Sequence, residues 1–208
     1  MIYDISPPII PGIAPWPGDA AYSEAWTMRL GPQCPVNVSQ IALSTHTGAH
    51  ADAPFHFDDA GAKIGAIDPS RYIGPCLLLE VSRARGLVQP EDISHLGPDR
   101  IDRVLLRTES NPDLTRWNRN FTAVADRTIE WLADCGVRLI GIDTPSLDPE
   151  SSKDLPAHKA AVRRGMLILE GLILAAVPPG NYELIALPLK LMNLDASPVR
   201  AVLRTLTK

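Results

Sequence analysis

Proline interrupts this sequence along almost its whole length. The 208 residues include 20 prolines, and many of them stand beside Gly, Asp or Ser. Because proline cannot donate a backbone hydrogen bond and breaks helix interiors, such a chain must contain many fixed turns and few long helices. A disordered chain is excluded as an explanation, since 45% of the residues are hydrophobic and only 21% are charged.

The length and charge of the chain limit the classes of function that it can serve. No linker or internal repeat divides the sequence, so residues 1–208 are expected to form one domain. The net charge of −4 offers no basic surface to nucleic acid or anionic lipid, which leaves a small molecule as the expected partner. The most apolar stretch, residues 166–178, is too short to span a bilayer and contains Glu170.

The cysteines and the N-terminus predict a cytoplasmic protein. Cys34, Cys76 and Cys135 are odd in number and far apart, and they fit neither a disulfide framework nor a CxxC metal site. Reduced thiols are therefore expected. The N-terminus has no basic region followed by a long apolar run, so it does not resemble a secretory signal.

Short apolar segments separated by turn residues predict a strand-rich α/β domain with a mixed central sheet. The segments expected to be strands are residues 36–43, 76–81, 104–107, 138–143, 182–191 and 199–204. Pro188 favours an edge or bulged position in the fifth of these. Helices are expected within residues 122–136, ending at Gly136, and around residues 91–96 and 157–164.

Three of the five histidines fall within eleven residues, with a carboxylate among them. They are His46, His50 and His56, and the carboxylate is Asp52. If this segment were fully extended, at about 3.3 Å per residue, its side chains would lie too far apart to share one ion. A helix would place His46 beside His50, but Gly48, Pro54 and the preceding strand argue against a helix. The segment must therefore bend, and Gly48 and Pro54 are placed to bend it.

A bent segment of this composition predicts a metal site. Imidazole and carboxylate ligands without cysteine suit Zn²⁺, Mn²⁺ or a similar ion, and a set of three such ligands leaves one coordination position open. The alternative, that these histidines only face solvent, is weaker because four such groups share one short loop. His95 stands alone at an expected helix end, and we assign it no functional role.

Residues 46–57, His-Thr-Gly-Ala-His-Ala-Asp-Ala-Pro-Phe-His-Phe, resemble the HxGTHxDxPxHF pattern of the cyclase-like family of metal-dependent amidohydrolases. Ala49 departs from the threonine of that pattern. Residues 15–19, 141–146, 182–190 and 197–200 are similar to further segments of the family, in the same order. Within the family the chain looks most like the bacterial kynurenine formamidases. This resemblance implies a swivelling β/β/α fold and a homodimer.

The resemblance also implies a role for each site residue. His56 would be the general acid and base, and Trp16 would contact the substrate. Two divalent ions, most readily Zn²⁺ with Mn²⁺ as the alternative, would be held by five ligands: His46, His50, Asp52, His158 and Glu170. Asp52 and Glu170 would each bridge the two ions. Glu170 has independent support, because an unpaired carboxylate inside an apolar run would be costly to bury.

The activity implied is hydrolysis of N-formyl-L-kynurenine to L-kynurenine and formate, a step in tryptophan degradation. Three alternatives remain at this point. The chain could be an isatin hydrolase or another cyclic-amide hydrolase, because specificity depends on pocket shape. It could also be a metal-dependent binder of small molecules without turnover. A purely structural metal loop is the third alternative, although a structural site should lack an open coordination position.

Overall fold

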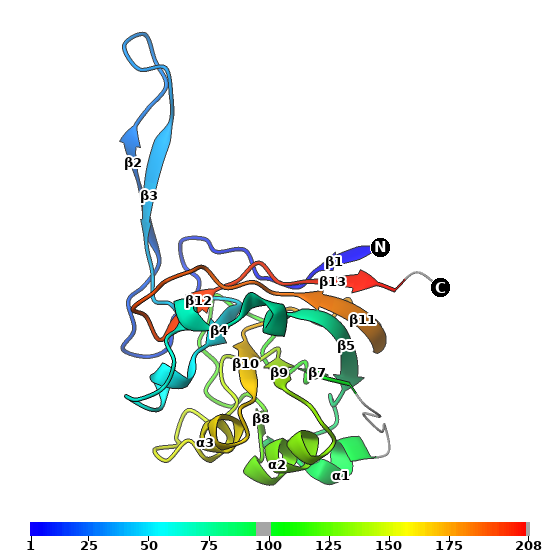
Figure 1. The fold of residues 1–208 in the computed structure, drawn as a ribbon. Coiled ribbons are helices and arrows are strands. Elements are labelled where there is room, and N and C mark those ends of the chain that lie inside the picture. The colour runs from blue at the N-terminus through cyan, green and yellow to red at the C-terminus, as the bar shows by residue number, and fades with distance from the viewer. Residues whose placement is uncertain (95–100, 207–208) are drawn as a thin grey trace.

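A nine-stranded mixed sheet organises the computed structural model, which describes residues 1–94 and 101–206. The order of its strands is β1-β13-β11-β5-β7-β9-β10-β4-β12. Their bounds are β1 Ile2–Asp4, β4 His50–Asp52, β5 Ile73–Glu80, β7 Arg103–Arg107, β9 Leu139–Ile142, β10 Leu167–Glu170, β11 Gly180–Ile185, β12 Ala196–Pro198 and β13 Val202–Thr205. Strands β5, β7, β9 and β10 are parallel, and the flanking strands pair antiparallel. Figure 1 shows that the sheet is strongly curled.

The three described helices lie together on the outer side of this sheet (Figure 1). They are α1 Pro90–Ile93, α2 Asp126–Asp134 and α3 Pro156–Arg163. Successive residues of β7 point to opposite faces, so Val104 and Leu106 pack in the core beneath the helices. Leu105 faces the opposite way, into a second core that the curled sheet encloses with residues of β5, β10, β11 and β13. Both faces of β7 are therefore buried, as its continuous apolar sequence predicts.

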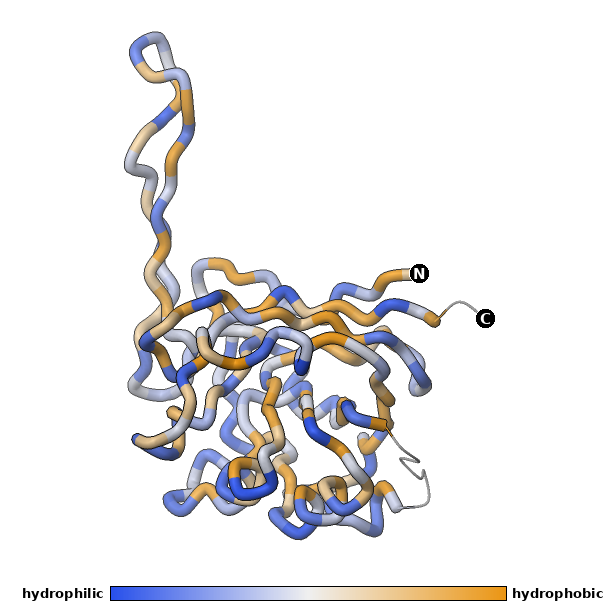
Figure 2. Tube along the Cα trace, viewed as in Figure 1, coloured by the Kyte–Doolittle hydropathy of each residue, from blue (hydrophilic) through white to orange (hydrophobic). Residues whose placement is uncertain are grey.

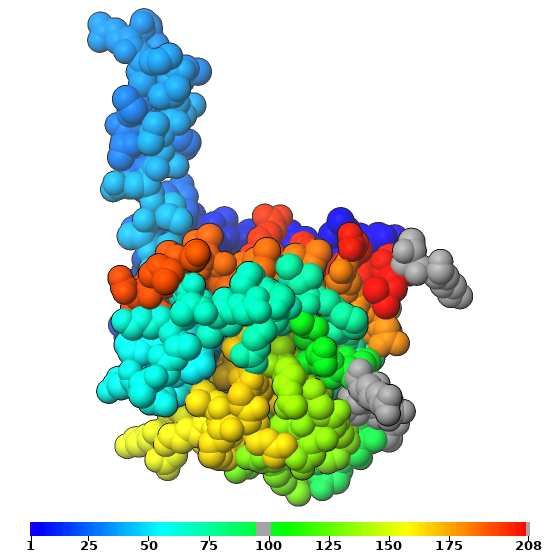
Figure 3. Space-filling model, in the orientation of Figure 1, coloured from blue at the N-terminus to red at the C-terminus, as the bar shows by residue number. Residues whose placement is uncertain are grey.

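A long two-stranded hairpin projects from this body. Its strands are β2 Ser23–Met28 and β3 Val38–Ala42, and every residue of both strands is exposed. Figures 1 and 3 show the hairpin standing clear of the rest of the molecule, and Figure 2 shows apolar residues along its length. An isolated two-stranded hairpin of this kind is at best marginally stable in water.

Most of the predicted elements are confirmed, with corrections at their ends. Strand β11 ends at Ile185, short of the predicted residue 191, and Pro188 forms only an isolated bridge with Val199. Helix α2 begins at Asp126, because residues before it form β8 Ala123–Val124, which pairs with β6 Leu87–Val88. Of the helix expected at residues 91–96, the described part is α1, whereas His95 lies outside the described residues.

Gly136, which follows helix α2, has a φ of +98°, as expected of a glycine that ends a helix.

Among the described residues, no helix is both long enough and apolar enough to cross a membrane.

Candidate active site

Two short strands bring the first three candidate ligands together. His50 and Asp52 are two residues apart on β4, so their side chains share one face of the sheet. Strand β10 pairs antiparallel with β4 and places Glu170 directly opposite His50. As a result, His50 Nε2 lies 3.4 Å from Glu170 Oε2 and 3.6 Å from Asp52 Oδ1.

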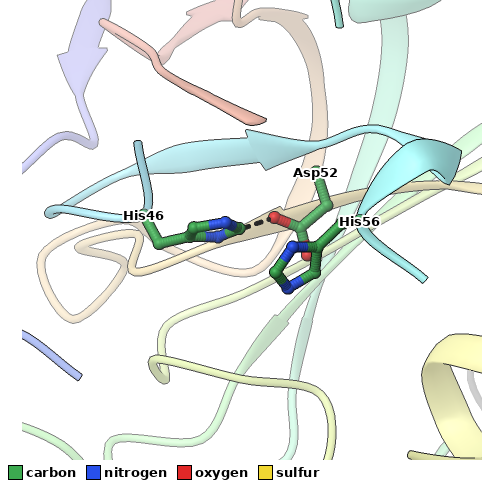
Figure 4. A group of neighbouring side chains, drawn as sticks. All are labelled: His46, Asp52 and His56. Carbon is green, nitrogen blue, oxygen red and sulfur yellow. Dashed lines mark ion pairs between the residues drawn. The ribbon is translucent and has the colours of Figure 1, made fainter. Parts of the chain in front are cut away.

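The chain bends on both sides of β4, at the two residues that the sequence indicated. Gly48 has a φ of +67°, and this turn brings His46 back so that its Nδ1 lies 3.1 Å from Asp52 Oδ1. Pro54 begins a short 3₁₀ helix, Pro54–His56, which presents His56 on the same side. The rings of His46 and His56 are 4.2 Å apart. Figure 4 shows both imidazoles beside the Asp52 carboxylate.

His158 reaches the same cluster from helix α3. Its Nε2 lies 3.0 Å from Glu170 Oε1 and 3.8 Å from Asp52 Oδ2. Its other ring nitrogen, Nδ1, is 2.6 Å from Asp148 Oδ2. A ligating histidine usually makes such a contact to a carboxylate with its second nitrogen, which fixes the tautomer and the ring orientation. The structure therefore brings together all five residues expected to be ligands.

The spacing of these atoms fits a divalent metal. Two ligand atoms on one tetrahedral zinc ion, each at 2.0–2.1 Å from it, are about 3.3 Å apart. The distances of His50 Nε2 to Glu170 and Asp52, 3.4 and 3.6 Å, are close to that value. Within the described chain, the buried atoms His50 Nε2 and Asp52 Oδ1 have no hydrogen-bond partner, and an ion would satisfy both.

Two groups of side chains have ligand atoms close enough to hold an ion. One is His50, Asp52 and Glu170, and the other is His46, Asp52 and His56. Asp52 belongs to both groups, as expected of a shared carboxylate. The second group places His56 within reach of an ion, so geometry alone allows it to be either a ligand or a proton-transfer group.

The charges in the cluster shift the titration of its members. Burial disfavours the charged form of His46, but the carboxylates of Asp52 and Asp195 outweigh it and raise the pKa of His46 to about 9. Burial likewise opposes the charge of His158, yet Glu170 and other carboxylates raise its pKa to about 10. The pKa of the buried Asp52 carboxyl is lowered by the imidazoles around it, despite its burial.

Metal uptake is therefore expected to release protons. At pH 7 the metal-free protein carries a proton on both His46 and His158, because each pKa lies above 7. A metal needs neutral imidazoles, so binding should expel about two protons, and affinity should increase as pH rises towards 9. Titration calorimetry of the EDTA-treated protein at pH 7, in buffers of different ionisation enthalpy, measures this number. A release close to zero would contradict the raised pKa values.

Sequence reasoning missed two carboxylates that hold the histidines in place. Asp195, just before β12, lies with Oδ2 at 2.9 Å from both His46 Nε2 and His56 Nδ1. Asp148 contacts His158 and also accepts hydrogen bonds from two backbone amides at the start of α3. Each stands alone in a turn, so neither has a local pattern that distinguishes it from a surface carboxylate. The signal lies only in the tertiary contacts.

The cluster lies in a pocket of about 580 Å³, which falls within the usual range for small-molecule sites. Trp16, predicted to contact substrate, lines this pocket and packs against Trp117 with ring centroids 5.0 Å apart. Phe57 lies between the His56 and His158 rings, at 4.4 and 4.5 Å. The pocket thus joins a wall of aromatic rings to a floor of histidines and carboxylates.

Gly171 allows the two ligand-bearing segments to touch. A Cβ at Gly171 would lie 2.2 Å from the carbonyl oxygen of Gly48, and Gly171 also has a φ of +67°. Gly171→Ala should therefore displace the turn between His46 and His50, lowering both metal content and Tm. Gly165→Ala is a matched control, because Gly165 has a φ of +63° but nothing within 4 Å of its Cβ.

The two alanine variants share the strain of a left-handed residue and differ in the clash. Overpacking costs about 1–3 kcal/mol, so the Tm of Gly171→Ala should lie roughly 2–12 °C below that of Gly165→Ala. Calorimetric melting and metal analysis of both variants make the comparison. Equal Tm and equal metal content would show that the close contact is unimportant.

A family model described as "Putative cyclase" matches residues 3–149 of the chain. The chain belongs to the cyclase family. This cyclase-family chain is 49% identical to the kynurenine formamidase of Bordetella avium (strain 197N) over 205 residues, covering 99% of this chain and 98% of that protein. It is 53% identical over 209 residues to the kynurenine formamidase of Paracidovorax citrulli (strain AAC00-1), covering 99% and 97%. The family predicted from residues 46–57 is confirmed.

Solved structures support the same family. A structure described as a potential metal-dependent hydrolase with cyclase activity is 31% identical, with a TM-score of 0.86 over 98% of this chain and 96% of its own. Isatin hydrolase A from Labrenzia aggregata has a TM-score of 0.83, covering 99% and 93%, but is only 24% identical, so this likeness concerns the fold alone. The curled mixed sheet with few helices is thus the fold of these hydrolases, as predicted.

Proposed function

We propose that this protein is a metal-dependent kynurenine formamidase, which hydrolyses N-formyl-L-kynurenine to L-kynurenine and formate in tryptophan degradation. The observation that supports this substrate assignment is the similarity to two kynurenine formamidases over 99% of the chain. The site supports the chemistry, because a cluster suited to metal and a more exposed histidine lie in one pocket with an aromatic wall.

The proposed reaction combines activation by a bound metal with proton transfer and substrate positioning by side chains of the pocket. When bound, divalent metal would polarise the formyl carbonyl and acidify the attacking water. His56 takes a proton from that water and then donates one to the departing aryl amine. Asp195, at 2.9 Å from His56 Nδ1, holds the ring so that Nε2 is left for this transfer. Trp16 packs against the aryl ring of the substrate.

We propose that the cluster holds two zinc ions, with Mn²⁺ as the alternative. Five ligands that include two buried carboxylates are supporting evidence, because Asp52 and Glu170 bring the negative charge that a pair of dications requires. Metal analysis of the purified protein should give two equivalents per chain. One equivalent would exclude the paired site.

The substrate assignment is tested with a panel of amides. Purified protein loaded with Zn²⁺ or Mn²⁺ is given N-formyl-L-kynurenine, isatin or a cyclic imide, and formate release and ring opening are followed separately. Fastest turnover is expected with N-formyl-L-kynurenine, and EDTA should abolish it. Preferential opening of isatin would reassign the protein to the isatin hydrolases. Ligand-induced shifts in melting without any product would favour a binder without turnover.

We propose that two chains associate through the β2–β3 arm. Large apolar side chains around the arm are 41–65% exposed, and they are Trp26, Met28, Leu30, Val36, Val38 and Ile41. Burial of such residues against a second copy would remove them from water and stabilise the arm. Light scattering should give the mass of a homodimer, and Trp26→Ser combined with Ile41→Ser should shift it towards one chain. A monomer in the unsubstituted protein would refute this assembly.

We also propose a cytoplasmic location. In support, Cys34 and Cys76 form no disulfide, as expected in a reducing compartment. Cell fractionation with immunoblotting tests this location, and recovery from the periplasm would contradict it.

A further inference from the structure

The loop between β7 and β8 forms one side of the pocket and is held in a fixed shape. Leu114, Arg116 and Trp117 of this loop line the pocket. The side-chain amide of Asn118 donates to the Ser110 carbonyl oxygen at 2.8 Å, which draws the two ends of the loop together. Trp117 is anchored through its Nε1, which donates to Glu150 Oε2 at 2.5 Å. Arg116 therefore extends from a well-supported backbone.

Arg116 is the only lysine or arginine among the described residues that line the pocket. The other ionisable groups there are histidines and carboxylates. A single cation in such surroundings would normally pair with one of those carboxylates, so its contacts decide whether it is available to a ligand.

Two carboxylates, Asp113 in this loop and Glu150 in the pocket wall, are already engaged by other groups. Asp113 accepts hydrogen bonds from the backbone amide and the hydroxyl of Thr115. Glu150 accepts from Trp117 and pairs with Arg119. Within residues 1–94 and 101–206, no salt bridge joins a carboxylate to the Arg116 guanidinium, although the charge of Arg116 contributes, after the hydrogen bonds from Thr115, to lowering the pKa of Asp113. Its charge is therefore available to an anion that enters the pocket.

We propose that Arg116 binds the α-carboxylate of an amino-acid group carried by the aryl formamide substrate. The proposal rests on the proposed function and adds its specificity-determining contact. A guanidinium presents two parallel N–H groups that match a carboxylate. Trp117, the next residue, packs against Trp16, so the loop that carries the cation also carries part of the wall for the aryl ring. Isatin is neutral at pH 7 and has no carboxylate with which to make this contact.

The test compares two substrates that share the scissile bond. N-formyl-L-kynurenine carries the amino-acid group, whereas 2′-formamidoacetophenone keeps the aryl formamide and the ketone but lacks it. For Arg116→Gln, the KM for N-formyl-L-kynurenine should rise about 10- to 100-fold with kcat little changed, as expected for loss of a charge-assisted hydrogen bond. Both constants for 2′-formamidoacetophenone should change less than about threefold.

Two further variants make the result specific. Arg116→Lys keeps the charge but loses the paired N–H groups, so its KM should be intermediate. Arg138→Gln removes an exposed arginine that immediately precedes β9 and does not line the pocket, so the kinetic constants for both substrates should be unchanged. An equal effect of Arg116→Gln on both substrates, or no effect on N-formyl-L-kynurenine, would overturn the proposal.

Binding of the reaction product tests the role of Arg116 independently of whether the protein has the proposed activity. L-kynurenine should bind Arg116→Gln at least about 10-fold more weakly than the unsubstituted protein, while 2-aminoacetophenone should bind both equally. Calorimetry measures this without turnover. If neither formamide is hydrolysed, the proposed function fails, and the kynurenine titrations still decide the role of Arg116. Equal binding of L-kynurenine to both proteins would exclude that role.

Discussion

His56→Ala is expected to reduce kcat by about 10²- to 10⁴-fold while leaving the metal content of the protein unchanged. That range is typical for removal of a general acid or base. The side chain of His56 is 33% exposed, much more than the buried imidazoles of His50 and His158, which suits a group that exchanges protons with solvent and substrate. Measurement requires kcat with N-formyl-L-kynurenine and metal analysis on the same sample.

The outcome decides between two roles that the geometry allows. His56 lies in a group with His46 and Asp52 whose ligand atoms are close enough to hold an ion. If His56→Ala lost metal along with activity, His56 would be a ligand and the proton-transfer role would have to be reassigned. If the variant kept full metal and retained near-normal kcat, His56 would have neither role.

Asp52→Ala is expected to lose metal and, with it, all measurable activity. Removing a residue that merely supports a ligand weakens metal binding about 10- to 100-fold, so losing a shared ligand should weaken it by at least about 100-fold. Asp52→Asn keeps the shape of the side chain and should show the same loss, which guards against a simple folding defect. Metal analysis and thermal melting of both variants, after dialysis at fixed free Zn²⁺, give the result.

Asp59 provides the matched control for that experiment. It is exposed, lies seven residues along the chain and does not line the pocket. Asp59→Asn should therefore keep full metal and full activity. A full metal complement in Asp52→Ala would refute the shared-carboxylate assignment, and loss in Asp59→Asn would show that net charge, not coordination, governs uptake.

The sequence was sufficient for β5, β7 and β9 but not for β10, a fully buried strand that was not predicted. The predictions for β5, β7 and β9 are confirmed, because a short apolar run between turn residues has no other common explanation in a globular domain. Strands β4 and β12 were not predicted, since three residues are too few for any periodicity. Strand β2 was also not predicted, although its equally exposed partner β3 was.

The site was predictable where its residues are close in sequence. The bend at Gly48 and Pro54 followed from chain reach alone, and the structure has both turns. The proximity of His158 and Glu170 to this segment came from the family resemblance, because no local pattern connects residues so far apart. Asp195 was not identified, since its contact with His46 and His56 depends on sheet order: β12 lies beside β4.

The antiparallel pairing of β4 with β10 also determines when the candidate site can form during synthesis of the chain. Glu170 stands opposite His50 only after strand β10 has been added to the sheet, and Asp195 reaches His46 only once β12 is in place. A ribosome-bound chain that ends before these strands lacks Glu170 and also Asp195, the carboxylate that contacts His46 and His56. The geometry of the candidate site is therefore complete only after nearly the whole polypeptide has folded.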